Sequence, residues 1–97
     1  MKPFALSPKA LADLEDIHDY IARDNAARAK SFTQELLQIC ERLPQNPEAY
    51  PARPKLGEGI RVAILGRYMI FFRNLTDEVR VERIIHGARD LVRQFKV

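Results

Sequence analysis

The chain has 97 residues, of which 46% are hydrophobic and 30% are charged. A chain of this size and composition buries its apolar side chains in one core, so we expect residues 1–97 to form a single domain. No apolar run approaches the roughly 20 residues that a membrane helix needs, and the start of the chain lacks the apolar stretch of a secretory signal. The sequence therefore predicts a cytoplasmic protein that does not enter a membrane.

The residue types that support small-molecule or metal chemistry are sparse. The one cysteine, Cys40, has no disulfide partner and no companions at metal-ligand spacing. The glycines lie in predicted turns and not at a strand-to-helix junction, where a phosphate-binding loop would need them. We therefore expect no metal, no cofactor and no small-molecule substrate.

The net charge of +3 conceals an asymmetry along the chain. Residues 1–49 carry 6 basic and 8 acidic side chains, whereas residues 50–97 carry 10 basic and 5 acidic ones. Arginine supplies most of the basic excess, and its planar guanidinium matches carboxylates and phosphates. The second half of the chain thus suits an acidic protein partner or a nucleic acid, and equally a solvated basic face without a specific partner.

Two amphipathic helices are predicted in the first half of the chain. The first begins at Pro8 with Ser7 as its N-cap, and both helices carry apolar stripes at spacings of three and four. Asp24 and Asn25 favour a turn between them, so the two helices should form a hairpin. The stripes consist of Leu11, Leu14, Ile17 and Ile21 in the first helix and of Ala29, Phe32, Leu36, Ile39 and Leu43 in the second.

A spacer with four prolines between residues 44 and 54 separates the helices from a segment in which the hydrophobic period changes to two. The alternation predicts a strand over residues 60–65. The nearly continuous apolar run at residues 68–73 predicts a central strand covered on both faces, and residues 78–86 give a third strand. Gly66 and Arg67 form a tight turn, residues 2–7 add an edge strand, and residues 88–97 form a short C-terminal helix or tail. The expected fold is α+β, with an N-terminal helical hairpin packed on a small antiparallel β-sheet.

Few side chains point to catalysis. The acidic residues of the first helix require only a solvated face, and His18 lies beside the apolar stripe, which favours a half-buried histidine over a ligand. His86 closes the last strand near Arg89, where it could act as a general acid or base on a phosphate or could hold the strand end in place. We favour the structural role, because no partner of opposite role stands at a fixed spacing. The acidic residues are Asp13, Glu15, Asp16 and Asp19.

Segments spread over almost the whole chain match a known family in order and residue type. They are residues 6–8, 12–17, 20–21, 59–61, 66–73 and 83–90, the last of which reads Arg-Ile-Ile-His-Gly-Ala-Arg-Asp. With these segments the chain resembles the ParE branch of the RelE/ParE toxins. The resemblance implies the toxin half of a bacterial type II toxin–antitoxin pair, bound in a hetero-oligomer by a ParD-like antitoxin that wraps across its surface.

The resemblance also bears on the target. RelE-like members cut messenger RNA on the ribosome with basic residues and usually a tyrosine near the C-terminus, whereas ParE-like members poison DNA gyrase. The RelE-type arginine corresponds to Met69 and the tyrosine to Phe95, and Arg89 alone keeps the expected type. Methionine cannot hold a phosphate, and phenylalanine has no hydroxyl for proton transfer. We therefore favour a gyrase inhibitor without catalytic residues.

Two alternatives stay open at this point. One is a ribosome-dependent ribonuclease that uses His86 and Arg89 with Arg53 or Lys55, and the other is a non-toxic module that only binds the antitoxin. For the leading hypothesis we expect an acidic or amphipathic antitoxin segment, steered by the basic half of the chain. The residues predicted to contact gyrase are Arg61, Arg83, His86, Arg89 and Arg93.

Overall fold

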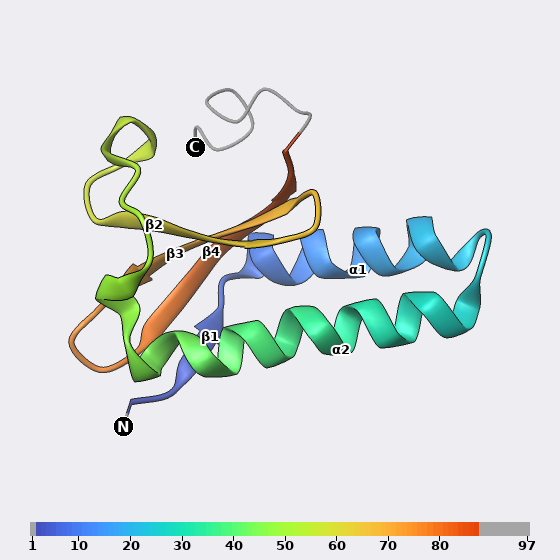
Figure 1. Ribbon diagram of the computed structural model, residues 1–97, viewed down its shortest axis with the longest axis horizontal. Coiled ribbons are helices and arrows are strands. Elements are labelled where there is room, and N and C mark those ends of the chain that lie inside the picture. Colours follow the sequence, from blue (N-terminus) through green and yellow to red (C-terminus); the bar gives the residue numbers. More distant parts are fainter. Residues whose placement is uncertain (1, 88–97) are drawn as a thin grey trace.

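The computed structural model describes residues 2–87. The elements are β1 (Phe4–Leu6), α1 (Pro8–Ala22), α2 (Ala26–Arg42), η1 (Leu43–Gln45), η2 (Pro47–Ala49), η3 (Pro54–Leu56), β2 (Ile60–Leu65), β3 (Tyr68–Asn74) and β4 (Val79–His86). In Figure 1, α1 and α2 lie side by side and run in opposite directions on one side of the sheet. The α+β fold with a helical hairpin is therefore confirmed, whereas the predicted C-terminal helix or tail lies outside the described residues.

Both helices begin at a polar cap, of which the one at Ser7 was predicted. The Ser7 side chain accepts a hydrogen bond from the backbone N–H of Ala10 at 3.0 Å, and Pro8 stands in the first turn, where its missing N–H costs nothing. The Asn25 side chain accepts from the N–H of Arg28 at 2.9 Å and so caps α2. The turn predicted at Asp24 and Asn25 thus joins the helices of a hairpin.

The buried stripe of α1 differs from the predicted one. Leu11 is 48% exposed, whereas Ala10 is fully buried together with Leu14 and Ile17. The start of the helix is fixed against β4, because the N–H of Ser7 donates to the carbonyl of Val81 at 2.9 Å. This contact rotates Ala10 toward the sheet, where a small side chain permits close approach of the helix.

Within the described residues the sheet has four strands in the order β1-β4-β3-β2. Strands β2, β3 and β4 form the predicted antiparallel meander, but β1 pairs with β4 in parallel, with Phe4 opposite Val79. The sheet is therefore mixed and not purely antiparallel. The helical hairpin, the spacer, β2 and β3 all lie between β1 and β4 along the chain, so no tight turn forces this pair to be antiparallel.

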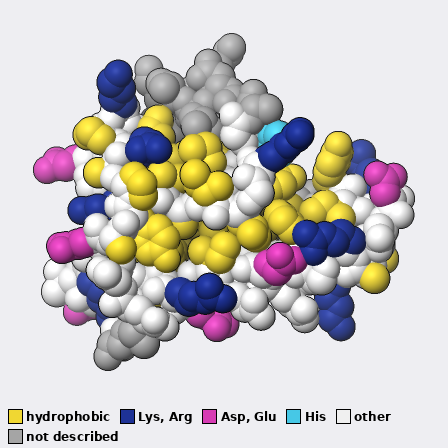
Figure 2. All heavy atoms as spheres, viewed as in Figure 1, with side chains coloured by type: hydrophobic (Ala, Val, Ile, Leu, Met, Phe, Trp, Pro, Cys, Tyr) yellow, Lys and Arg dark blue, Asp and Glu magenta, His cyan; other side chains and the backbone are white. Residues whose placement is uncertain are grey.

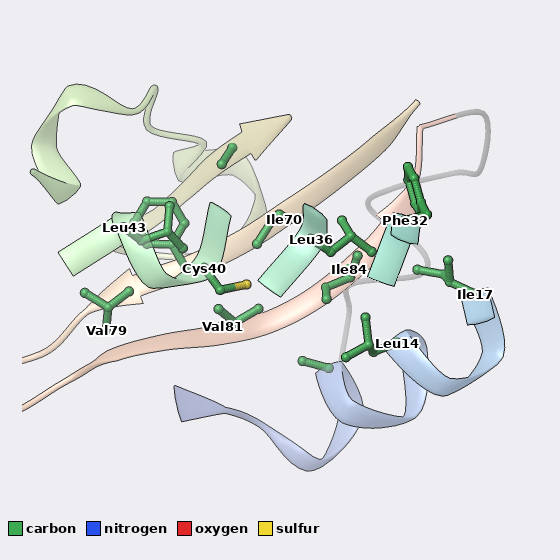
Figure 3. Close-up of a cluster of buried hydrophobic side chains, with 13 residues drawn as sticks. Leu14, Ile17, Phe32, Leu36, Cys40, Leu43, Ile70, Val79, Val81 and Ile84 are labelled. Atoms are coloured by element: carbon green, nitrogen blue, oxygen red, sulfur yellow. The ribbon is translucent and has the colours of Figure 1, made fainter. Parts of the chain in front are cut away.

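The main core lies between the sheet and the two helices. Figure 3 shows side chains from α1, α2 and the sheet pointing toward one another in this layer. A smaller cluster lies on the opposite face of the sheet, so Phe72 points into the main core and its neighbour Phe71 into the second one. Both are fully buried, as predicted for a strand covered on both faces. The second cluster consists of Ile60, Val62, Phe71 and Ile85, with Leu56 and Met69 packed against it.

Cys40 lies in the main core and is fully buried. Removal from water raises the pKa of its thiol to about 12. No helix within residues 2–87 is long and apolar enough to span a bilayer.

Candidate partner-binding site

The outer edge of β4 changes partner along its length. Strand β1 covers Val79 to Val81, and beyond that point the Asp13 side chain of α1 takes over. One carboxylate oxygen of Asp13 accepts from the backbone N–H of Ile84 at 3.0 Å. The same carboxylate receives the guanidinium of Arg83 through Nε at 2.7 Å and Nη2 at 2.9 Å. A helix side chain therefore substitutes for a neighbouring strand at this edge.

A β-bulge lies next to this contact. Phe71 stands opposite Arg83 and Phe72 opposite Val81, so Glu82 is the extra residue of β4. The bulge brings Ile84 to the helix-facing side of the sheet with Val79 and Val81, while Glu82 pairs with Arg73 of β3. The hydrogen bond to Asp13 raises the pKa of Arg83 above its ordinary value, because the charged form of the guanidinium is the one bound.

The expectation that Asp13 belongs to a solvated acidic face is wrong. The side chains of Asp13 and Arg83 are only 16% and 17% exposed, respectively. Asp13 follows Ala10 by three residues and precedes Ile17 by four, so it lies beside the buried face of α1. This spacing was the signal that sequence reasoning missed. By contrast, Glu15, Asp16 and Asp19 are exposed, as predicted.

Arg61 makes contacts at the other edge of the sheet. Its Nη1 donates to the carbonyl of Tyr50 at 2.6 Å and thereby holds the proline-rich spacer against β2. The spacer also pairs with β2 through its backbone, since the N–H of Arg53 donates to the carbonyl of Ile60 at 2.8 Å. Arg61 and Arg83 therefore point to opposite edges of the sheet.

His86 ends β4 opposite Tyr68 of β3. The two rings meet edge to face with centroids 5.1 Å apart, and the Tyr68 ring lies 5.4 Å from that of Phe32 on α2. The Arg28 guanidinium covers the Phe32 ring at 5.1 Å. This row of rings joins the end of the sheet to α2, which supports a structural role for the half-buried His86.

Two hollows flank His86. The larger, of about 550 Å³, lies between α1 and the ends of β3 and β4, and we call it the α1–β4 groove. The smaller, of about 410 Å³, lies over the turn between β2 and β3.

One face of the molecule, shown in Figure 2, carries a patch of apolar side chains bordered by Lys and Arg side chains. The α1–β4 groove is lined by Asp13, Asp16, Ile17, Asp19, Tyr20, Arg23, Tyr68, Ile84 and His86, and the smaller hollow by Ile64, Gly66, Arg67, Met69, His86 and Gly87.

The structure brings only part of the predicted contact set together. Arg83 and His86 lie on β4, Arg61 lies at the far edge of the sheet, and Arg89 and Arg93 lie outside the described residues. Within residues 2–87, no three His, Cys, Asp or Glu side chains gather as metal ligands would. The sequence reasoning did not single out the exposed Tyr20 or Arg67, which line the two hollows. Gly66 and Arg67 were predicted only as a tight turn, without a functional role for Arg67.

The described part of the chain thus belongs to the α+β class, with a helical hairpin packed on one face of a mixed four-stranded sheet. The same fold occurs in a solved structure described as the chromosomal ParDE TA system from P. aeruginosa, with a TM-score of 0.74, 26% identity, and coverage of 89% of this chain and 95% of that one. Toxin ParE1 of Caulobacter vibrioides is 31% identical over 89 residues, which are 91% of this chain and 92% of that protein. The family model of the ParE toxin of the type II toxin–antitoxin system parDE matches residues 4–91. The chain therefore belongs to the ParE toxin family, and the resemblance read from the sequence is confirmed.

Proposed function

We propose that this protein is a cytoplasmic toxin that inhibits DNA gyrase and is neutralised in a hetero-oligomeric complex with a ParD-like antitoxin. The observation that carries the proposal is membership of the ParE toxin family over residues 4–91. The similar structure from P. aeruginosa, described as a ParDE system, supports an antitoxin partner. The absence of a membrane-spanning helix in residues 2–87 is compatible with this setting.

Two observations favour gyrase over messenger RNA as the target. Met69 packs against the second core cluster, so the position that corresponds to a RelE-type arginine carries an apolar side chain with a packing role. Arg53 lies beside Ile60, whereas His86 lies beside Tyr68, which pairs with Leu65. Strand geometry separates the backbones of Arg53 and His86 by about 22 Å, that is, five residues along the sheet and three interstrand spacings across it. The two side chains therefore do not form a preassembled catalytic pair.

The predicted gyrase contacts divide into two groups. Arg61 and Arg83 already bind groups within the chain, so replacing them also removes structural contacts. His86 borders both hollows at the end of the sheet, and Arg89 and Arg93 follow it within seven residues of chain. We assign the gyrase contact to this second group, with arginines offering forked donors to carboxylates of the enzyme or phosphates of its DNA.

The test is supercoiling by purified gyrase with increasing amounts of this protein, with cleaved DNA scored alongside. The wild-type chain should inhibit supercoiling, and its cognate antitoxin should relieve the inhibition. Arg89→Glu with Arg93→Glu should abolish inhibition, while the matched reversal of Lys9→Glu with Lys30→Glu, on exposed helix positions, should not. Folded wild-type protein that leaves gyrase active but cuts translated messages would refute the gyrase target. Folded protein that binds antitoxin and harms neither process would identify a non-toxic module.

A further inference from the structure

The α1–β4 groove has a chemical character unlike the rest of this basic chain. One wall is the second half of α1, where Tyr20 is 67% exposed despite its large ring. The opposite wall is formed by the ends of β3 and β4, where Tyr68 and Ile84 lie beyond the reach of β1. The groove thus offers aromatic and aliphatic surface next to a sheet edge, and its volume of about 550 Å³ can hold several side chains.

Carboxylates dominate the charge along this groove. Asp13 is neutralised by Arg83, but Asp16 and Asp19 are exposed on α1. Asp19 lies 3.4 Å from Nδ1 of His18, and Arg23, four residues after Asp19, is the one arginine in the lining of the groove. Carboxylates at these positions repel the phosphates of a nucleic acid, so the groove favours a protein segment over DNA or RNA.

The exposed Tyr20 and the carboxylates of Asp16 and Asp19 lie on the α1 wall of the groove, and the half-buried Tyr68 lies on the opposite wall. These rings and carboxylates attract the same kind of group. A guanidinium or ammonium is drawn to the face of a tyrosine ring, and it forms charge-assisted hydrogen bonds with carboxylates. The aliphatic stem of the same side chain packs on apolar surface such as Ile17 and Ile84. An acidic segment would gain neither contact.

We propose that the α1–β4 groove receives a basic segment of the antitoxin, with an arginine or lysine between Tyr20 and Tyr68 and its charge directed at Asp16 and Asp19. This inference rests on the proposed function, because it names the part of the partner that this surface binds. It differs from the acidic segment expected from the overall charge, which would bind elsewhere on the basic surface. The antitoxin then contacts the toxin through segments of opposite charge.

The test compares binding of the purified cognate antitoxin to variants of the full chain by calorimetry at two salt concentrations. Asp16→Asn with Asp19→Asn should weaken binding about tenfold and reduce its dependence on salt, because two exposed interfacial charge pairs are lost. Tyr20→Ala should weaken binding to a similar extent. The matched controls are Glu41→Gln with Glu48→Gln, which remove two exposed carboxylates outside the groove, and Leu11→Ala, which truncates an exposed apolar side chain of α1. All variants should keep the circular dichroism of the wild type.

Each other outcome overturns the proposal in a recognisable way. Unchanged or tighter binding by the Asp16 and Asp19 variant, with wild-type binding intact, refutes the groove but leaves the toxin–antitoxin function standing. Failure of the folded wild-type chain to bind antitoxin refutes both. The same variant is also compared in the background of Arg89→Gln with Arg93→Gln. If its effect disappears there, the carboxylates act on basic residues of this chain and not on the antitoxin.

Discussion

Asp13 should be the most important charged residue for stability, and Asp13→Ala tests this. The substitution removes the acceptor of the Ile84 amide and the two hydrogen bonds that Asp13 accepts from the Arg83 guanidinium. A buried amide without a partner costs about 1–3 kcal/mol, and breaking a buried ion pair by removing one partner costs about 3–5 kcal/mol. Because both side chains retain some contact with water, at 16% and 17% exposure, the expected loss lies at the lower end. We expect the free energy of unfolding to fall by about 3 kcal/mol.

Urea unfolding followed by circular dichroism measures this loss, with Asp16→Ala as the matched control. Both substitutions replace an aspartate within α1 by alanine, so the gain in helix propensity is the same and cancels in the comparison. Asp16 is exposed, and its replacement should change stability by less than about 0.5 kcal/mol. Asp13→Asn keeps an oxygen for the Ile84 amide but loses the charge, so its stability should lie between those of the wild type and Asp13→Ala.

The reasoning is refuted if Asp13→Ala unfolds at the same urea concentration as Asp16→Ala. A second variant separates the ion pair from the backbone contact. Arg83→Met in the Asp13→Ala background removes the charge that has lost its carboxylate. The double variant should therefore lose less unfolding free energy than the sum of the losses in the two single variants. Strict additivity would mean that the two side chains do not interact in solution.

Three further predictions concern the core and the β-hairpin formed by β2 and β3. Burial raises the pKa of the Cys40 thiol to about 12, whereas an unfolded thiol ionises near 8.5. The free energy of unfolding should therefore decline above about pH 8.5, by up to about 1.4 kcal/mol per pH unit. In Cys40→Ala this decline should be smaller when unfolding is measured from pH 8 to 11. Leu14→Asp should abolish folding, because Leu14 is 7% exposed among apolar side chains, and native circular dichroism in this variant would contradict the core. Gly66 has a φ of 59°, as required at the first central position of a type II′ turn, so Gly66→Val should destabilise the hairpin by about 1 kcal/mol or more in thermal unfolding.

The sequence predicted the helices and strands of this fold better than the pairing of the strands and the contacts between distant side chains. The cap residues Ser7 and Asn25 mark helix starts locally, and alternation marks strands locally, so both could be read along the chain. The parallel pairing of β1 with β4 joins residues about 75 positions apart and depends on where the hairpin crosses the sheet. The bulge at Glu82 has no local residue signature, and it shifts the alternation of β4 so that Ile84, whose amide donates to Asp13, shares the helix-facing side with Val79 and Val81. Side-chain contacts across such distances follow from the assembled fold and not from spacing.

The structure also changes how the arginine-rich second half is interpreted. Arg61, Arg73 and Arg83 hold the spacer, the bulge and α1, respectively, so much of the basic excess stabilises the fold. Arg67 differs, since its exposed side chain makes no hydrogen bond or ion pair within the described part of the chain. A loss of toxicity on replacing Arg83 would therefore combine misfolding with any loss of contact. The same loss on replacing Arg67, beside His86, would report on a binding surface alone.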